Sequence, residues 1–346
     1  MKFPINETTI LDYFKTLVSI PSPTGYSVKI IPAIDAICAE LGYAVTHDNN
    51  NGSYITIAGE DPSKTVFVSS HLDTLGLMVR KINPDGTLAF RKVGGGNLAT
   101  MEGESVTVHT RDGREYTGLL LCKYHSVHVF ENAHNAERNE DTMMVLLDES
   151  VNTRAQAEAL GISNGDVISI DPRPQITPNG YLKSRFIDDK AGVACCLSAL
   201  KYMKENGLKP KYNTVIGFSA YEEVGMGGSY LPFEADEMVA LDIGLIGPEL
   251  DGNERKVSIC PKDGSTIYDY DLTGRLIECA KRAEIPYAVD LFFRYGSDAG
   301  AARRAGNNVK VALCGMAVYG SHGMERTHVE GLQATTNLLL AYLLDI

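Results

Sequence analysis

Two adjacent glutamates, Glu222 and Glu223, follow a strongly apolar run and precede a glycine-rich turn. The apolar run, residues 214–220, has the composition of a buried strand, so both carboxylates are expected at a strand end. Like charges this close repel each other, and burial raises the pKa of at least one carboxyl group. A bound cation relieves the repulsion, as does a proton that is used in chemistry. We therefore predict that one glutamate binds a metal ion and that its neighbour acts as a general base.

Further polar side chains occur where other strands are expected to end. They are His71, Asp73, Asp188, Asp242 and His322. Ligands of open α/β sheets bind at the carboxyl ends of the strands, so these side chains are expected to converge in one crevice. His71 and Asp73 are two residues apart and lie on the same side of an extended strand. Asp73 can then accept a hydrogen bond from the ring of His71 and fix its tautomer.

The charges in this crevice indicate a pair of cations. Asp188, Glu222, Glu223 and Asp242 together contribute four negative charges, which two divalent ions neutralise. Paired metal ions about 3.5–4 Å apart, bridged by a carboxylate and a water molecule, are a recurring hydrolytic site. Mixed histidine and carboxylate ligands suit zinc, cobalt or manganese better than calcium. The bridging water has a lowered pKa, which makes hydroxide available near neutral pH.

Each signal alone has a simpler explanation. The pair Asp188–Asp189 is compatible with a helix cap, and Asp242 is compatible with an ordinary turn. His328 lies six residues after His322 and competes with it for a ligand role. Of the remaining histidines, His125 and His128 are interpreted as core-packing or surface residues. His47, His109 and His134 are interpreted as surface residues. The ordered occurrence of all the polar residues at strand ends favours a single site.

The composition is that of a globular protein with a large core. The 346 residues are 44% hydrophobic and 22% charged, and the net charge is −12. This negative charge argues against nucleic acid or an anionic membrane as a partner. No run of about 18 apolar residues predicts a membrane span, and the first residues lack the apolar segment of a signal peptide. The seven cysteines form no CxxC pair and are expected to be reduced, in a cytoplasmic protein.

The order of the predicted elements defines the fold class. Strands near residues 54–57, 65–70, 214–220, 238–241 and 309–313 alternate with helices near 8–19, 27–41, 190–205, 273–283 and 330–344. This alternation predicts an α/β fold with a mixed, largely parallel sheet between helices. Short strands and hairpin turns between them indicate a small all-β barrel, inserted at residues 77–178. The catalytic domain is then discontinuous, comprising residues 1–76 and 179–346.

The motifs carry a family resemblance. The order His71-x-Asp73, Asp188-Asp189-Lys190, Glu222-Glu223-Val224-Gly225, Asp242 and His322 resembles the dinuclear-metal aminopeptidases of metallopeptidase family 42. This family includes glutamyl and deblocking aminopeptidases, and some members are labelled endoglucanase. The resemblance covers almost the whole chain, including the β insert and the loops at 19–25 and 296–299. Residues 323–328 resemble a bacterial subgroup of deblocking aminopeptidases.

The resemblance implies a role for each residue. Asp188 bridges the two metal ions, His71 and Asp242 complete one site, and Glu223 and His322 complete the other. Glu222 is the general base that takes a proton from the bridging water and passes it to the leaving amine, and Asp73 supports His71. Thr74 stands where the family usually has glutamate. The resemblance further implies that the insert is a dimerisation domain within a homo-oligomer, often a dodecameric tetrahedron.

The predicted function is therefore hydrolysis of N-terminal residues from short peptides by a metal-bound hydroxide. Two divalent ions per subunit are expected, zinc first, with cobalt or manganese as alternatives. A second hypothesis keeps the site but makes the substrate an N-acyl amino acid or small amide, as in an amidohydrolase or deacylase. A third is a non-catalytic assembly protein. Glycoside hydrolysis instead needs two carboxylates that flank a sugar and no metal.

Overall fold

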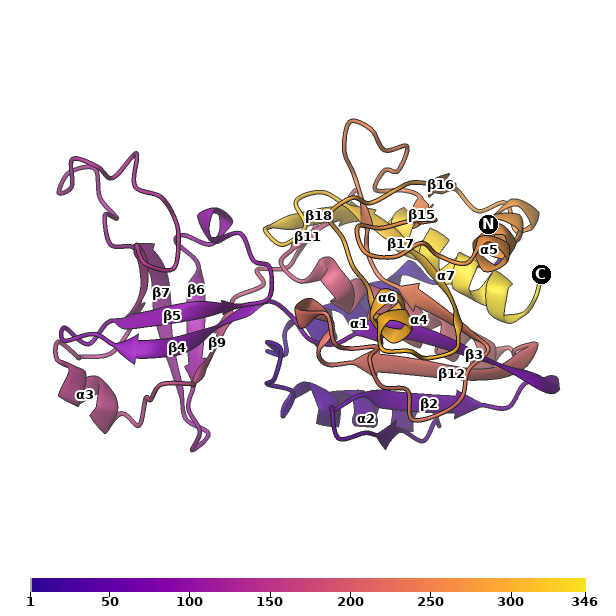
Figure 1. Cartoon of the computed structure of the whole chain (residues 1–346), viewed down its shortest axis with the longest axis horizontal. Helices are drawn as coiled ribbons and strands as arrows, with labels where there is room; N and C mark the ends of the chain where they lie inside the picture. Colours follow the sequence, from indigo (N-terminus) through magenta and orange to yellow (C-terminus); the bar gives the residue numbers. More distant parts are fainter. Residues whose placement is uncertain (1) are drawn as a thin grey trace.

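The protein consists of two parts that lie side by side. The structure, a computed structural model, describes residues 2–346. Figure 1 shows a body of helices and a sheet on the right and a β-barrel on the left. Both chain termini lie on the body, at the end away from the barrel.

A nine-stranded mixed sheet forms the centre of the body. Its order is β1 (Thr46–His47), β2 (Ser53–Ile57), β12 (Tyr212–Ser219), β3 (Asp61–His71), β13 (Glu237–Leu241), β17 (Lys310–Val318), β15 (Val257–Ile259) and β16 (Tyr287–Val289), and β14 (Gly244–Leu245) pairs with β17. The four central strands β12, β3, β13 and β17 are parallel to one another. They are apolar along much of their length because both faces of the sheet are covered. The predicted mixed, largely parallel sheet is confirmed.

Helices cover both faces of this sheet. Their bounds are α1 (Glu7–Val18), α2 (Ile30–Glu40), α4 (Ile187–Glu205), α5 (Tyr270–Arg282), α6 (Asp298–Arg304) and α7 (Val329–Leu343). Buried residues of α1, α2, α4, α5 and α7 share one hydrophobic core, whereas Ala299 and Ala302 of α6 belong to a second. In α1 the side chain of Asn6 accepts a hydrogen bond from the N–H of Thr8 and caps the helix. Its buried residues are those that the helical spacing predicts: Ile10, Phe14, Leu17 and Val18.

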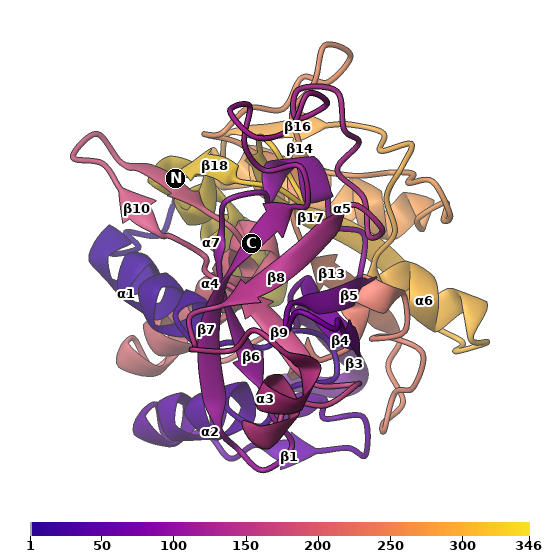
Figure 2. The ribbon, with the colours of Figure 1, turned by 90° about the vertical axis from the view of Figure 1, so that its left-hand side faces the viewer.

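The inserted part is a closed antiparallel barrel. Its strands are β4 (Gly76–Ile82), β5 (Leu88–Val93), β8 (Met143–Leu147), β7 (Glu115–Cys122), β6 (Ser105–His109) and β9 (Val167–Ile170), in that order around the barrel. Figure 2 shows the barrel in front of the body, with the short helix α3 (Arg154–Ala159) at its edge. The all-β insert is therefore confirmed, whereas the division into domains at residues 77 and 178 stays a prediction.

His109 corrects one expectation from the sequence. It is buried, although a surface position was predicted. Its Nδ1 lies 2.7 Å from Oε1 of Glu115 and its Nε2 lies 2.8 Å from Oγ of Ser169, and its ring stacks on Tyr26. The end of β6 that carries His109 lies against Tyr26 instead of facing solvent, and the alternation of residues along the strand does not reveal this contact.

A small three-stranded sheet joins distant parts of the chain. Strands β10 (Gln175–Ile176) and β11 (Tyr181–Ser184) form a hairpin, and β18 (Glu325–His328) adds to it. Ser184 pairs with Glu325 and Tyr181 pairs with His328, both in antiparallel register. This pairing brings the segment before α4 next to the segment before α7.

The strand order explains why the predicted polar residues lie together. The strands β12, β3, β13 and β17 are neighbours and run in the same direction, so their carboxyl ends meet at one edge of the sheet. Glu222, His71, Asp242 and His322 lie at or just after these four ends. Asp188 approaches the same edge from the start of α4.

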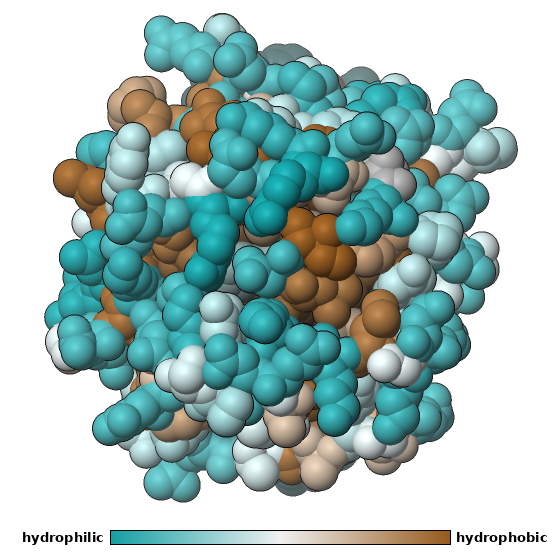
Figure 3. Space-filling model, turned by 90° about the vertical axis from the view of Figure 1, so that its right-hand side faces the viewer, coloured by the Kyte–Doolittle hydropathy of each residue, from teal (hydrophilic) through white to brown (hydrophobic). Residues whose placement is uncertain are grey.

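The surface facing away from the barrel is largely hydrophilic. Figure 3 shows charged and polar side chains over most of this face, with several separate hydrophobic groups among them. Within residues 2–346, no helix has both the length and the apolar character needed to cross a membrane.

A glycine on β17 allows the backbone of Asp242 to approach closely. A Cβ atom at Gly315 would lie 1.5 Å from the carbonyl oxygen of Asp242. We expect Gly315→Ala to lower the free energy of unfolding by about 1–3 kcal/mol, because β17 must move away from the backbone of Asp242, at the end of β13, to admit the methyl group. Urea denaturation followed by circular dichroism measures this change.

Gly274 provides the matched control for this substitution. It lies inside α5, and a Cβ atom there meets no other heavy atom within 4 Å. Gly274→Ala should raise the free energy of unfolding, by up to about 1 kcal/mol, because alanine favours the helix. Equal stability of Gly315→Ala and the unmodified protein would contradict the packing argument.

Candidate metal centre

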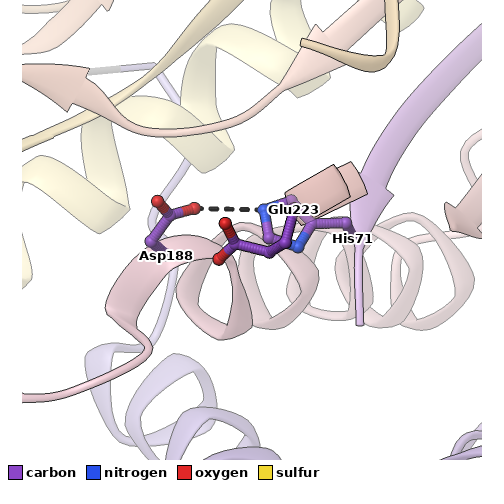
Figure 4. Close-up of side chains that lie close together, drawn as sticks. All are labelled: His71, Asp188 and Glu223. Carbon is purple, nitrogen blue, oxygen red and sulfur yellow. Dashed lines mark hydrogen bonds and ion pairs between the residues drawn. The ribbon is translucent and has the colours of Figure 1, made fainter. Parts of the chain in front are cut away.

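Three of the predicted ligands meet at the sheet edge. One ligand atom from each of His71, Asp188 and Glu223 lies within 4.8 Å of the others. Figure 4 shows their side chains close together, with an interaction joining Asp188 and His71. The distance from Nε2 of His71 to Oδ1 of Asp188 is 3.0 Å. His71 ends β3, Asp188 lies in the kinked first turn of α4, and Glu223 belongs to the 3₁₀ turn η2 (Glu222–Val224) after β12.

His322 lies on the other side of Asp188. Its Nε2 is 3.5 Å from Oδ2 of Asp188 and 3.5 Å from Oε2 of Glu223. The two carboxylate oxygens of Asp188 therefore face two different histidines. This is the arrangement expected of a carboxylate that is shared between two cations.

Asp242 belongs to a second group of candidate ligands. It lies with His71 and Asp189, again with one ligand atom of each within 4.8 Å of the others. Asp189 was absent from the predicted ligands, although it stands beside Asp188 in the motif. It is fully buried, and its Oδ1 has no hydrogen-bond partner within residues 2–346. Helical spacing cannot reveal its direction, because Asp188 and Asp189 both depart from helical torsion angles.

Asp73 supports the site differently from the prediction. The Nδ1 of His71 lies 2.9 Å from the main-chain oxygen of Asp73, so the carbonyl group, rather than the carboxylate, makes the predicted contact. The carboxylate instead accepts hydrogen bonds from the N–H groups of Glu222, at 3.1 Å, and Glu223, at 3.2 Å. Thr24 donates its hydroxyl to the same carboxylate at 2.6 Å. Asp73 thus fixes both the histidine ring and the glutamate turn.

Glu222 lies beside the ligand groups. Its Oε2 is 3.9 Å from Nε2 of His71. It lines a pocket of about 670 Å³, whose other walls include Asp188, Glu223, Asp242, His322, Tyr295, Arg294 and Arg304. The side chain can therefore face a small molecule that enters the pocket.

The close grouping of buried acids shifts the pKa of most titratable groups in the site. Burial raises the pKa of Glu222 and Glu223 well above its usual range, and it raises the pKa of Asp242 to about 7. Burial opposes protonation of the two histidines, but hydrogen bonding to Asp188 and nearby negative charges raise the pKa of His322 to about 10 and that of His71 well above normal.

The donor set fits divalent cations. It combines imidazole nitrogens with carboxylate oxygens, of which one, Oδ1 of Asp189, is buried and without a partner. Such mixed donors suit zinc, cobalt or manganese. His328 is directed elsewhere, because its Nε2 lies 2.7 Å from the main-chain oxygen of Asn179. Among the residues from 2 to 346, the two groups around His71 are the only sets of three or more such ligands.

Comparison with known proteins identifies relatives over nearly the full chain. The profile of the M42 glutamyl aminopeptidase family matches residues 51–338. YhfE of Bacillus subtilis (strain 168), named as a candidate aminopeptidase, is 40% identical over 333 residues, which cover 96% of each chain. The TET aminopeptidase of a marine sediment thaumarchaeon has a TM-score of 0.88 at 19% identity, covering 97% of this chain and 96% of that one. The Pyrococcus horikoshii TET1 peptidase, described as assembling into a tetrahedron or an octahedral shell, has a TM-score of 0.83 at 21% identity, covering 97% and 100%.

The buried acids predict how the stability of the metal-free protein depends on pH. Glu222, Glu223 and Asp242 hold protons more tightly in the folded chain than in the unfolded chain. Their contribution to stability is full below the unfolded pKa of about 4 and is lost as the pH rises through the folded values. We therefore expect the melting temperature of the chelator-treated protein to fall between about pH 5 and pH 8.

With added zinc, the melting temperature should rise with pH instead of falling. A cation competes with the protons and binds the folded state, so it stabilises the protein by about 2.7 kcal/mol at a hundredfold excess over its dissociation constant. Differential scanning fluorimetry at several pH values, with and without Zn²⁺, measures both effects. A melting temperature that rises with pH in the chelator-treated protein would contradict the prediction. So would a melting temperature that does not change when the cation is added.

Proposed function

This chain belongs to the M42 glutamyl aminopeptidase family, and from that premise we propose that it removes N-terminal residues from short peptides using two divalent cations and Glu222 as general base. One observation carries the proposal. Glu222 lines one pocket with Asp188 and Glu223, and His71 lies beside them, with its Nε2 3.0 Å from Oδ1 of Asp188. His71, Asp188 and Glu223 come from three distant segments of the chain. A group of metal ligands beside a carboxylate that is free to move a proton is the minimum requirement for this hydrolysis.

We assign the ligands as the family resemblance implies. Asp188 is shared between the cations, His71 and Asp242 complete one site, and Glu223 and His322 complete the other. Asp189 is a further candidate on the side of His71 and Asp242. When bound, the two cations lower the pKa of a water molecule and polarise the scissile carbonyl group. Zinc is the first candidate, and cobalt and manganese are alternatives.

Glu222 moves the proton in this proposal. As the water oxygen bonds to the carbonyl carbon, one water proton passes to the Glu222 carboxylate. The carbon–nitrogen bond then breaks, and the proton passes from Glu222 to the leaving nitrogen. Burial raises the pKa of Glu222, which is the direction that allows it to hold a proton between the two steps. Asp73 keeps Glu222 in place through its hydrogen bond to the main-chain N–H.

Membership of an aminopeptidase family supports a substrate with a free amino terminus. The volume of the pocket, about 670 Å³, limits the part of a peptide that can enter. Peptides with a free terminus are therefore proposed in preference to the acylated substrates of a deacylase.

We further propose that residues 77–178 form a separate dimerisation domain in a homo-oligomer. The barrel projects from the body, which leaves much of its surface available to other subunits (Figure 1). A related peptidase is described as a tetrahedron. Closed symmetry of this kind is the usual form of homo-oligomers, and we take the dodecameric tetrahedron as the specific expectation.

Glu222→Gln tests the proposed base. The amide cannot accept the proton, so kcat on leucyl or glutamyl amides should fall at least about 10²–10⁴-fold. The metal content should stay at two ions per subunit, because Glu222 is not assigned as a ligand. Plasma mass spectrometry and steady-state kinetics measure the two quantities.

Glu234→Gln is the matched control, because it changes an exposed glutamate outside the pocket. It should leave kcat and metal content unchanged. Retained turnover in Glu222→Gln would reject the role of base. Faster hydrolysis of N-acetyl amino acids than of aminoacyl amides by the unmodified protein would favour a deacylase.

Light scattering after gel filtration tests the assembly. We expect a mass twelve times that of one chain, because identical surfaces that repeat around closed symmetry axes produce one defined size. The measurement is repeated at two protein concentrations to exclude a mixture. The mass of a single chain at both concentrations would reject the homo-oligomer.

A further inference from the structure

A buried glutamate outside the predicted ligand set contacts two of the proposed ligands. Glu325 is 2% exposed and stands at the start of β18. Its Oε2 accepts a hydrogen bond from the main-chain N–H of Asp188 at 3.0 Å. Its Oε1 accepts one from the main-chain N–H of His322 at 3.2 Å. One carboxylate therefore joins two segments that are far apart in the sequence.

Both N–H groups lie where the backbone is irregular. Asp188 is in the first turn of α4, where N–H groups have no acceptor within the helix. Its ψ of 107° also departs from helical geometry. His322 has a φ of 63°, a left-handed conformation that few residues other than glycine adopt. The carboxylate thus accepts hydrogen bonds from two N–H groups at irregular points of the backbone.

Glu325 is itself held firmly. Its backbone pairs with Ser184 in the small sheet of β11 and β18. Ser184 is four residues before Asp188, and Glu325 is three residues after His322. The strand pair therefore fixes the Glu325 carboxylate relative to both segments. Its two hydrogen bonds then fix the positions of the Asp188 and His322 backbones.

Packing alone does not account for a carboxylate at this position. In the described part of the chain no lysine, arginine or histidine forms an ion pair with Glu325, while Asp188 lies close by. A buried carboxyl group without a cation is costly unless hydrogen bonds offset the loss of water. An apolar side chain of similar size would fill the space at lower cost. The two hydrogen bonds to main-chain N–H groups therefore point to a role in the geometry of the site.

We propose that Glu325 is a positioning residue that sets the separation of Asp188 and His322 so that their side chains can share a divalent cation. The inference rests on the proposed function. It is supported by the 3.5 Å distance between Oδ2 of Asp188 and Nε2 of His322, on the side chains of the same two residues whose N–H groups Glu325 holds. Asp73 makes the same use of a carboxylate when it holds the N–H groups of Glu222 and Glu223.

Glu325→Gln is the first test. The amide offers one oxygen, and its NH₂ group faces the second main-chain N–H, so one hydrogen bond is replaced by two opposed donors. We expect at least one of the two cations to bind about 10–100-fold more weakly. Competition against a chromogenic chelator measures this affinity, and the visible spectrum of the Co²⁺-substituted protein reports the altered ligand geometry.

Glu325→Asp separates position from charge. The carboxylate is retained but is one methylene group shorter, so it cannot reach both N–H groups from the same backbone position. We expect this variant to bind cations more weakly as well. It therefore tests the same inference if Glu325→Gln does not fold. Glu330→Gln is the control, because Glu330 is exposed and pairs with Arg255. It should bind both cations with unchanged affinity.

The melting temperature distinguishes positioning from a purely structural role. A structural role lowers the melting temperature equally with and without cation, so the rise produced by Zn²⁺ stays the same. A positioning role makes that rise smaller. Normal affinity for both cations in Glu325→Gln and Glu325→Asp would overturn the inference alone. A wild-type protein that binds no cation would instead overturn the proposed function.

Discussion

The constraint on which the structure depends is the burial of negative charge. Asp73, Asp188, Asp189, Asp242 and Glu325 are all at most 6% exposed, and they lie at one edge of the sheet together with Glu222 and Glu223. Carboxylates taken out of water at such density repel each other. The fold must therefore supply positive charge or hydrogen-bond donors to each of them. The proposed cations supply the positive charge, and His71 and His322 bind them as neutral ligands.

Main-chain N–H groups supply the donors. Asp73 accepts them from Glu222 and Glu223, Asp189 accepts one from His71, and Glu325 accepts them from Asp188 and His322. Each of these carboxylates is close to the site and is hydrogen-bonded to the backbone of a proposed ligand or of Glu222. The acids that hold the backbone thus have a different task from those that face the pocket. Both sets are needed because the proposed ligands lie at strand ends, in the kinked first turn of α4 and in turns, where regular backbone hydrogen bonding is incomplete.

The parts of this arrangement that the sequence predicts are those that depend on local pattern. Apolar runs identified the central strands, and the parallel order of β12, β3, β13 and β17 then gathered the residues at their ends. The local sequence pattern does not predict a role for Glu325, because its strand has only four residues and pairs with β11, which is far away in the sequence. The helix α6 was not predicted, and only its first two residues fell in the loop assigned at 296–299. Ser297 caps this helix, but seven residues give too short a periodic pattern to recognise. Asp189 and His109 were missed because their directions depend on packing between elements.

The loop that leaves the barrel after β5 reaches the site itself. The ring Nδ1 of His322 lies 3.3 Å from the carbonyl oxygen of Gly95, and the N–H of Asn97 donates to the carbonyl oxygen of His322 at 3.3 Å. The insert is consequently no detachable module. Excising it and rejoining its ends with a flexible linker would remove one wall of the pocket and the acceptor that orients the imidazole. Exchange of barrels between relatives would succeed only where this stretch of backbone is carried across intact.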